Sequence, residues 1–300
     1  MGGVNCVSPH RITRRCIRQF TSYPNRRSAA LHFAPIWLAY KLRLSAALYP
    51  KGSDPHIMNV LVVFCHPEPS SFNGALKDTT VQVFESSGAT VEVSDLYAEN
   101  FDPVEKQEHY RTRIKTDTFE PLSEQRHSYK TETLPPDVER EIQRLRKSDL
   151  VIFQFPLWWH QQPAMIKGWC DRVFVAGGLY TSKMRYDKGY FQGKRVICSV
   201  TSGAPEDTFT EFGRGGGEIA KLLHPLNYSL HYMGFSVLPP RLITEVQGAG
   251  FTYKDPEEFA ASLQLKLSNW ASYLENINSV EPMSFPGWGD WDEHGVEKKV

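Results

Sequence analysis

An apolar run, a loop with two adjacent tryptophans and an amphipathic segment follow one another at residues 149–172 (DLVIFQFPLWWHQQPAMIKGWCDR). The run at 150–155 has the length and the apolar character of a strand that is buried on both faces of a sheet. Pro156 ends the run, and Pro163 suits the first position of a helix. Apolar residues then recur at spacings of three and four, namely Met165, Ile166, Trp169, Cys170 and Val173. The stretch therefore predicts a strand, a loop and a helix.

The rest of the chain repeats this alternation of strand-like runs and helix-like segments. The expected strands are 58–65, 90–95 at an edge, 150–155, 194–200, and 235–238, which Pro239-Pro240 stops. The expected helices are 74–87, a helix capped by Asp137, the helix that begins at Pro163, and 256–275. This order predicts an α/β fold, a doubly wound parallel five-stranded sheet of order 2-1-3-4-5 with helices on both faces. The polar stretch 101–136 has little periodicity and predicts an excursion beside a site or at a subunit contact.

Three loops follow the carboxyl ends of these strands, where ligands bind in a sheet of this kind. Residues 66–73 carry serines and an asparagine, which suit a phosphate-binding helix start and equally suit plain helix capping. Residues 156–160 carry the two tryptophans, which either pack on neighbouring elements or form a wall for a flat ligand. Residues 201–204 contain Gly203, where the missing side chain lets a ring approach the backbone. The three loops together favour a flavin.

Net charge, apolar runs and cysteine content exclude several classes of function. Thirty-four basic and thirty-four acidic residues give a formal net charge of zero, so no global field attracts nucleic acid or anionic lipid. No apolar run approaches the roughly 20 residues of a membrane-spanning helix, which predicts no membrane span. The five cysteines are scattered outside any Cys-x-x-Cys pair, which predicts reduced core thiols with neither a disulfide framework nor a metal site. We expect a small or neutral partner.

Both ends of the chain differ in composition from its centre. Residues 1–53 hold seven arginines, two lysines and no acidic residue. This composition is typical of a mitochondrial transit peptide, and it equally fits upstream translation ahead of a true start at Met58. We expect a basic extension at 1–57, a catalytic domain at 58–280, and an aromatic tail at 281–300 that either docks on the surface or stays loose. The expected location is the cytoplasm, or the mitochondrion if the extension is a genuine transit peptide.

Six motifs connect the chain to a known family. They are Phe64–Asn73 (FCHPEPSSFN), Ser94–Tyr97, Phe155–Trp159, Lys167–Phe174, Tyr186–Gly189 and Thr201–Gly203. With these motifs in the family's order, the chain resembles the NAD(P)H:quinone oxidoreductases, the DT-diaphorase-like flavoproteins with a flavodoxin-like fold. The resemblance extends from about Met58 to about Phe235.

The resemblance implies a ping-pong, two-electron reduction of quinones by NAD(P)H through a bound flavin. The implied cofactor is FAD, with FMN as the alternative, and the implied partners are a quinone or related small aromatic acceptor and a second copy of the chain, with the active site near the dimer interface. Negative charge on the reduced flavin is expected to be stabilised by the backbone amides of Leu157, Trp158, Trp159 and Gly203. The implied cofactor-binding residues are His66, Ser71, Phe72, Asn73, Pro156, Leu157, Trp158, Trp159, His160, Thr201, Ser202, Gly203 and Ala204.

One departure from the family concerns its charge relay. Where the animal enzymes have a Tyr and a His, ungapped alignment places Phe209 and Gly215, whose side chains cannot donate a hydrogen bond. His160 and Tyr180 are therefore the expected catalytic substitutes. The family places the tyrosine that matches Tyr180 at the catalytic pocket, often across the dimer interface.

Two further segments have weaker patterns. The run 213–217 fits no nucleotide-binding motif, and we interpret it as a flexible loop that opens a helix near Glu218. Lys254 is the expected lysine near a diphosphate.

Three other functions fit parts of the sequence. A flavodoxin-type electron carrier is usually strongly acidic, whereas this chain is neutral and has bulky aromatic residues suited to a substrate pocket. A flavin-dependent azoreductase or nitroreductase would share the fold and differ in its acceptor. A regulatory subunit would bind flavin without turnover of its own. The quinone reductase interpretation is favoured over these.

Overall fold

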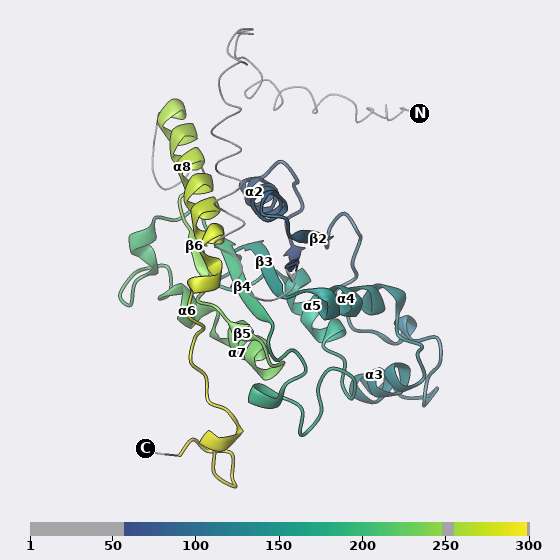
Figure 1. Ribbon diagram of the computed structural model, residues 1–300. Coiled ribbons are helices and arrows are strands. Elements are labelled where there is room, and N and C mark those ends of the chain that lie inside the picture. Colours follow the sequence, from purple (N-terminus) through teal and green to yellow (C-terminus); the bar gives the residue numbers. More distant parts are fainter. Residues whose placement is uncertain (1–56, 248–254, 299–300) are drawn as a thin grey trace, which may run out of the picture. The chain divides into compact units, whose positions relative to one another are not determined.

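The computed structural model describes residues 57–247 and 255–298 (Figure 1), all within one compact unit, Ser45–Val300. The expectations for the basic extension, as far as residue 56, and for Lys254 lie outside the described residues. Five strands form the main path of the sheet: β1 (Asn59–Phe64), β2 (Thr90–Asp95), β3 (Leu150–Pro156), β4 (Arg195–Thr201) and β5 (Ser236–Val237). Their order is β2-β1-β3-β4-β5 and every pairing is parallel, as expected, with β2 at an edge.

The fifth position of the sheet differs from the expected single strand at 235–238. A sixth strand, β6 (Arg241–Ile243), pairs with the carboxyl half of β4, while β5 pairs with its amino half. Pro239 and Pro240 lie between the two short strands, and neither has an N–H to give to the ladder. The prolines therefore divide the fifth strand into two short strands, which both lie beside β4. As a result, the chain after β6 reaches the same edge of the sheet as the other carboxyl ends.

Helices cover both faces of the sheet (Figure 1). On one face, α2 (Phe72–Ser86) and α8 (Pro256–Glu275) pack through Leu76, Phe84, Trp270 and Leu274. On the other face lie α4 (Pro136–Lys147), α5 (Ala164–Val173) and α7 (His224–Tyr232). The strand residues alternate between these two clusters, so β1 and β3 are buried on both sides.

Three local differences from the sequence-based expectations concern helices. The polar stretch 101–136 contains α3 (Pro121–Lys130), which has little apolar periodicity to reveal it. Asp137 does not cap α4, because Pro135 is the N-cap and Asp137 lies in the first turn, where it pairs with Arg172 at 2.6 Å. Pro163 is the residue before α5. A short helix, α6 (Ile219–Leu222), follows Glu218 as expected.

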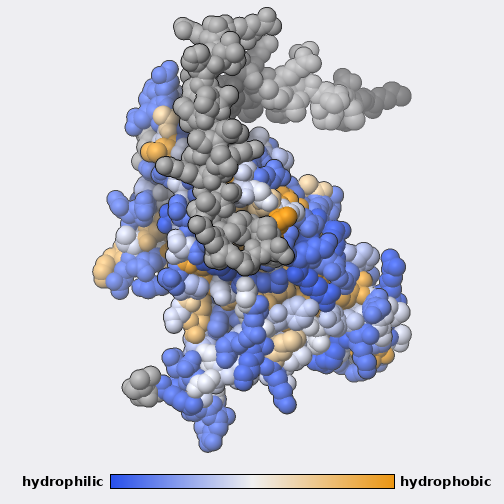
Figure 2. All heavy atoms as spheres, in the orientation of Figure 1, coloured by the Kyte–Doolittle hydropathy of each residue, from blue (hydrophilic) through white to orange (hydrophobic). Residues whose placement is uncertain are grey.

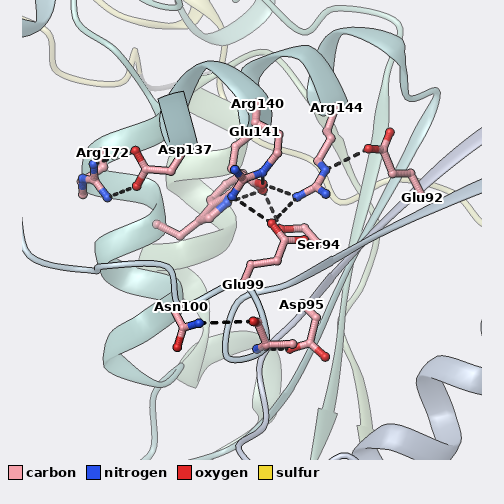
Figure 3. A network of polar contacts seen from close by, with 12 residues as sticks. Glu92, Ser94, Asp95, Glu99, Asn100, Asp137, Arg140, Glu141, Arg144 and Arg172 are labelled. Carbon is pink, nitrogen blue, oxygen red and sulfur yellow. Dashed lines mark hydrogen bonds and ion pairs between the residues drawn. The ribbon is translucent and has the colours of Figure 1, made fainter. Parts of the chain in front are cut away.

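A buried carboxylate joins α4 to β2 and α5 (Figure 3). Glu141 is 0% exposed, and its Oε2 accepts hydrogen bonds from the Ser94 hydroxyl at 2.7 Å and from the Trp169 indole N–H at 2.9 Å. Its Oε1 accepts from Arg144, which also reaches Glu92 at 2.9 Å. These contacts fix α5, and hence the loop that precedes it, against the sheet.

The C-terminal segment lies on the chain that follows α5. The Trp288 indole N–H donates to the backbone oxygen of Arg185 at 2.9 Å, and the ring of Tyr186 meets the rings of Trp288 and Trp291 at centroid distances of 5.4 and 4.6 Å. Within the described residues, no helix is long and apolar enough to cross a membrane. The face seen in Figure 2 is mainly hydrophilic, with small, separate hydrophobic areas.

Candidate functional site

A cavity of about 690 Å³ lies at the carboxyl edge of the sheet, where the loops after β1, β3 and β4 meet. This volume is within the usual range for a small-molecule site. Every residue of the expected cofactor-binding set lines it. The lining residues are His66, Ser71, Phe72, Asn73, Pro156, Leu157, Trp158, Trp159, His160, Thr201, Ser202, Gly203, Ala204, Thr208, Phe209, Arg214, Gly215, Val246 and Gln247.

The first loop delivers the N-terminus of a 15-residue helix to the cavity. Ser71 is the N-cap of α2, and its hydroxyl accepts a hydrogen bond from the Gly74 N–H at 3.2 Å. The described residues provide no acceptor for the N–H groups of Phe72 and Asn73. Two donors at the positive end of a helix dipole suit a phosphate. The His66 ring is held by its own loop, with Nδ1 at 3.0 Å from the Glu68 backbone.

The second loop is a tight turn with unusual backbone angles. Trp158 and Gln161 exchange two backbone hydrogen bonds, at 3.1 and 3.0 Å, and the residues between them have positive φ angles, 51° at Trp159 and 61° at His160. Positive φ at both central positions defines a type I′ turn, which ordinarily takes Asn-Gly. Non-glycine residues in this region cost about 1–3 kcal/mol each and cluster at functional sites.

This turn determines how the aromatic residues lie. Trp159 is 93% exposed, so it does not pack on neighbouring elements, while Trp158 is 41% exposed. His160 lies against the loop that follows β4, because a Cβ on Gly216 would stand 3.1 Å from the His160 Cδ2. The turn therefore presents an indole at the cavity that is open to contact by a flat ligand.

The backbone amides of this loop require a correction. The N–H of Leu157 donates to the Thr201 oxygen at 2.8 Å, and the N–H of Trp158 donates to the Gln161 oxygen. Neither N–H is available to a ligand, because that of Leu157 is bonded to β4 and that of Trp158 is bonded within the turn. Among the described residues, the N–H groups of Trp159 and Gly203 have no acceptor. Two of the four expected amides therefore remain.

The third loop brings the backbone close to the cavity. A Cβ on Gly203 would stand 2.5 Å from the Gln247 Oε1, so the Gln247 side chain fills the space that the missing side chain leaves. The expected approach of a ring at that side of Gly203 therefore requires the Gln247 side chain to move. Phe209 and Gly215, the positions that depart from the family, line the cavity as well. A side chain at residue 215 would meet the Thr208 backbone oxygen at 2.6 Å. A histidine therefore does not fit there while this loop keeps its path.

Tyr180 is not brought to this cavity within one chain. It lines a separate cavity of about 430 Å³ together with Gln162, Tyr228 and Tyr232, and its ring meets that of Tyr232 at a centroid distance of 5.7 Å. Burial and the nearby Tyr232 raise the pKa of Tyr180 above its ordinary value. The hydroxyl therefore stays protonated at neutral pH.

Four lining residues were not predicted: Thr208, Arg214, Val246 and Gln247. Val246 and Gln247 follow β6, a strand that the double proline concealed. The other two belong to the loop after β4, whose glycine run was interpreted only as flexible. Its place after the carboxyl end of a central strand is the signal that could have identified it.

The chain has relatives of known family. The family described as flavodoxin-like fold matches residues 58–272. NAD(P)H dehydrogenase [quinone] 1 of Cavia porcellus is 36% identical over 231 residues, 76% of this chain and 80% of the relative. Ribosyldihydronicotinamide dehydrogenase [quinone] of Homo sapiens is 40% identical over 228 residues, 75% of this chain and 94% of the relative.

A solved structure from Klebsiella pneumoniae, assigned as a quinone reductase, is also similar, with a TM-score of 0.71 and 31% identity over 80% of this chain and 94% of the solved one. The residues that the family model matches, 58–272, include the sheet and all three loops of the cavity. The chain belongs to the NAD(P)H dehydrogenase (quinone) family of flavodoxin-like proteins.

Proposed function

We propose that this protein is a flavin-dependent NAD(P)H dehydrogenase that reduces quinones by two electrons. The observation that carries the proposal is the meeting of three loops at one cavity, with N–H groups at the start of α2 and at Gly203 that have no acceptor among the described residues, and with an exposed indole. A bound flavin would accept a hydride from NAD(P)H and pass two electrons to the quinone. The family relationship supports this choice of donor and acceptor.

The residues of the cavity fit a flavin by their chemistry. The N–H groups of Phe72 and Asn73 would hold the phosphate, and each charge-assisted hydrogen bond contributes about 1.5–3 kcal/mol. Trp159 would form a wall against the ring system. The free N–H groups of Trp159 and Gly203 would stabilise negative charge that develops on reduction.

His160 is our proposed catalytic residue within one chain. It lines the cavity on which Phe209 and Gly215 also border, and neither of those two can donate through a side chain. The loss of a preorganised donor costs about a hundredfold to a thousandfold in rate. An imidazole at this place would supply a donor that the departure from the family removes.

We propose FAD as the flavin, with FMN as the alternative. The support is the loop at residues 64–73, whose resemblance to that of the animal enzymes implies FAD. Mass spectrometry of the flavin released by heat distinguishes the two, since only FAD carries the adenosine monophosphate part.

We propose that two copies of the chain form a dimer in which Tyr180 of one copy reaches the site of the other. The support is the separation of Tyr180 from the main cavity within one chain and the exposure of Trp159 at that cavity. Sedimentation velocity is expected to give a mass near twice 34.2 kDa. A monomer that turns over at the full rate would contradict this arrangement.

For location we propose the cytoplasm, or the mitochondrion if the basic extension is a transit peptide. Three of the cysteines, Cys65, Cys170 and Cys198, lie buried as free thiols. Burial raises the pKa of Cys65 and Cys170 to about 12, which keeps both thiols protonated and unreactive. Fractionation of cells, with N-terminal sequencing of the protein, distinguishes the two locations.

The function is tested on the purified chain by absorbance, flavin mass, and NAD(P)H oxidation with and without menadione. We expect a yellow protein whose NAD(P)H oxidation depends on the quinone. Colourless protein that takes up neither FAD nor FMN would overturn the proposal. Flavin binding without turnover would instead favour a regulatory subunit.

Trp159→Ala is expected to raise the flavin dissociation constant about tenfold or more, because stacking on an aromatic ring contributes about 1–3 kcal/mol. The matched control is Phe212→Ala, since Phe212 is 94% exposed but does not line the cavity. We expect the control to stay within twofold of the wild type, as measured by flavin fluorescence titration. Equal losses in both variants would contradict the placement of the ring system at Trp159.

A further inference from the structure

Three buried polar side chains form a chain of hydrogen bonds beneath the cavity. The Gln154 Nε2 donates to the Asn73 Oδ1 at 2.8 Å, and the Asn73 Nδ2 donates to the Thr201 Oγ1 at 2.8 Å. The exposed fractions are 0% for Gln154, 3% for Asn73 and 2% for Thr201. The three residues come from β3, α2 and β4, the elements that border the three loops of the site.

The chain of bonds has a direction. An amide NH₂ group can only donate, so the Thr201 oxygen must accept from Asn73. The hydroxyl proton of Thr201 therefore takes no part in this hydrogen bond, and the described residues provide no acceptor for it. Thr201 lines the cavity. Its proton is therefore available to an acceptor atom bound there.

Gln154 determines this direction, although it does not line the cavity. If both amides were turned over, Asn73 would accept the Thr201 proton and donate to the Gln154 oxygen. The NH₂ group of Gln154 would then stand where its Oε1 now lies, and that place has no partner among the described residues. Two buried N–H donors would therefore lack an acceptor. Buried donors are left unpaired less often than buried acceptors. The observed direction is therefore the favoured one.

We infer that Gln154 is a positioning residue that, through Asn73, keeps the Thr201 hydroxyl as a hydrogen-bond donor to the ring system of the flavin. The inference rests on the proposed function. Because the ring system gains negative charge on reduction, a donor stabilises the reduced form more than the oxidised form. Gln154 thus raises the reduction potential of the bound flavin without touching it.

A double-mutant cycle with Gln154→Met, Thr201→Val and the double variant tests this inference on the flavin-loaded protein. The measurements are the midpoint potential by spectroelectrochemistry and the dissociation constant of the oxidised flavin. Thr201→Val is expected to weaken binding of the reduced flavin about tenfold more than binding of the oxidised flavin. This difference lowers the two-electron potential by about 30 mV. Gln154→Met is expected to lower the potential in the same direction. The double variant is expected to match Thr201→Val, because Gln154 acts through Thr201.

Two further variants separate positioning from a merely structural role. Gln154→Glu is expected to restore the wild-type potential, because burial keeps its carboxyl protonated and able to donate to Asn73. Ser199→Ala is the matched control, since Ser199 pairs with Gln154 across the sheet, is 0% exposed and takes no part in the chain of bonds. Its potential is expected to be unchanged.

The possible outcomes distinguish a failure of the inference from a failure of the proposed function. Additive shifts in the cycle, or a Gln154→Met potential equal to the wild type, would overturn the inference while leaving the flavin assignment intact. A wild-type protein that binds no flavin would overturn both. If Gln154→Met does not fold, the cycle is run with Asn73→Asp, whose carboxylate accepts the Thr201 proton. The shift in midpoint potential caused by Asn73→Asp is then expected to be smaller when Thr201→Val is also present. A shift of the same size with and without Thr201→Val would overturn the inference.

Discussion

Gly74→Ala is expected to raise the flavin dissociation constant at least a hundredfold and to destabilise the fold by about 1–3 kcal/mol. Gly74 is the third residue of α2, and a Cβ there would stand 1.9 Å from the Pro69 backbone oxygen. Helix propensity alone would favour alanine by about 1 kcal/mol. The contact with rigid backbone outweighs this preference, so the segment around Pro69 must move away from the helix. The donors at the helix start then lose their place beside the cavity.

Flavin fluorescence titration and urea denaturation measure the two effects of Gly74→Ala. Gly289→Ala is the matched control, because a Cβ on Gly289 would have no atom of the described residues within 4 Å. We expect the control to bind flavin as the wild type does. A Gly74→Ala protein with wild-type affinity would refute the assignment of the α2 N-terminus as the phosphate site.

Glu141→Ala is expected to lower the free energy of unfolding by about 3–5 kcal/mol, which is typical of removing one partner from a buried charged cluster. The Ser94 hydroxyl and the Trp169 indole N–H would lose their acceptor in the interior, and Arg144 would lose one of its carboxylates. Each buried group left without a partner costs about 1–3 kcal/mol. The loss would be a large part of the 5–15 kcal/mol by which a typical domain is stable.

Urea denaturation of Glu141→Ala and of Glu139→Ala gives the comparison. Glu139 lies on the same helix, has a side chain 44% exposed, and reaches Arg146 only at 4.0 Å. Exposed pairs of this kind contribute about 0–1 kcal/mol. Similar losses in the two variants would mean that the buried cluster adds nothing specific to the stability of α4.

Much of the fold was predictable because its elements have strong local patterns. The runs at β1, β3 and β4 are apolar throughout most of their length, and each ends at a loop that carries polar, aromatic or glycine residues. Parallel strands bring their carboxyl ends to one edge, so three loops far apart in the sequence had to meet. The location of the cavity follows from topology alone.

The remaining features depend on contacts that no local pattern reveals. The double proline after β5 is a good stop signal for one strand, but it does not prevent the chain from resuming the same position in β6. The loss of the Leu157 and Trp158 amides depends on pairing partners in the turn and on β4. Likewise, the hydrogen bonds of Asn73 join residues 81 and 128 positions apart.

The turn at residues 158–161 has a consequence for engineering. Selection for thermal tolerance alone would replace Trp159 and His160 by Asn-Gly, which adopts these backbone angles without strain. The same replacement would remove the exposed indole and the imidazole from the cavity. Thermal tolerance therefore conflicts at these two positions with the roles that we propose for Trp159 and His160, so substitutions that raise the tolerance of this protein have to be made elsewhere.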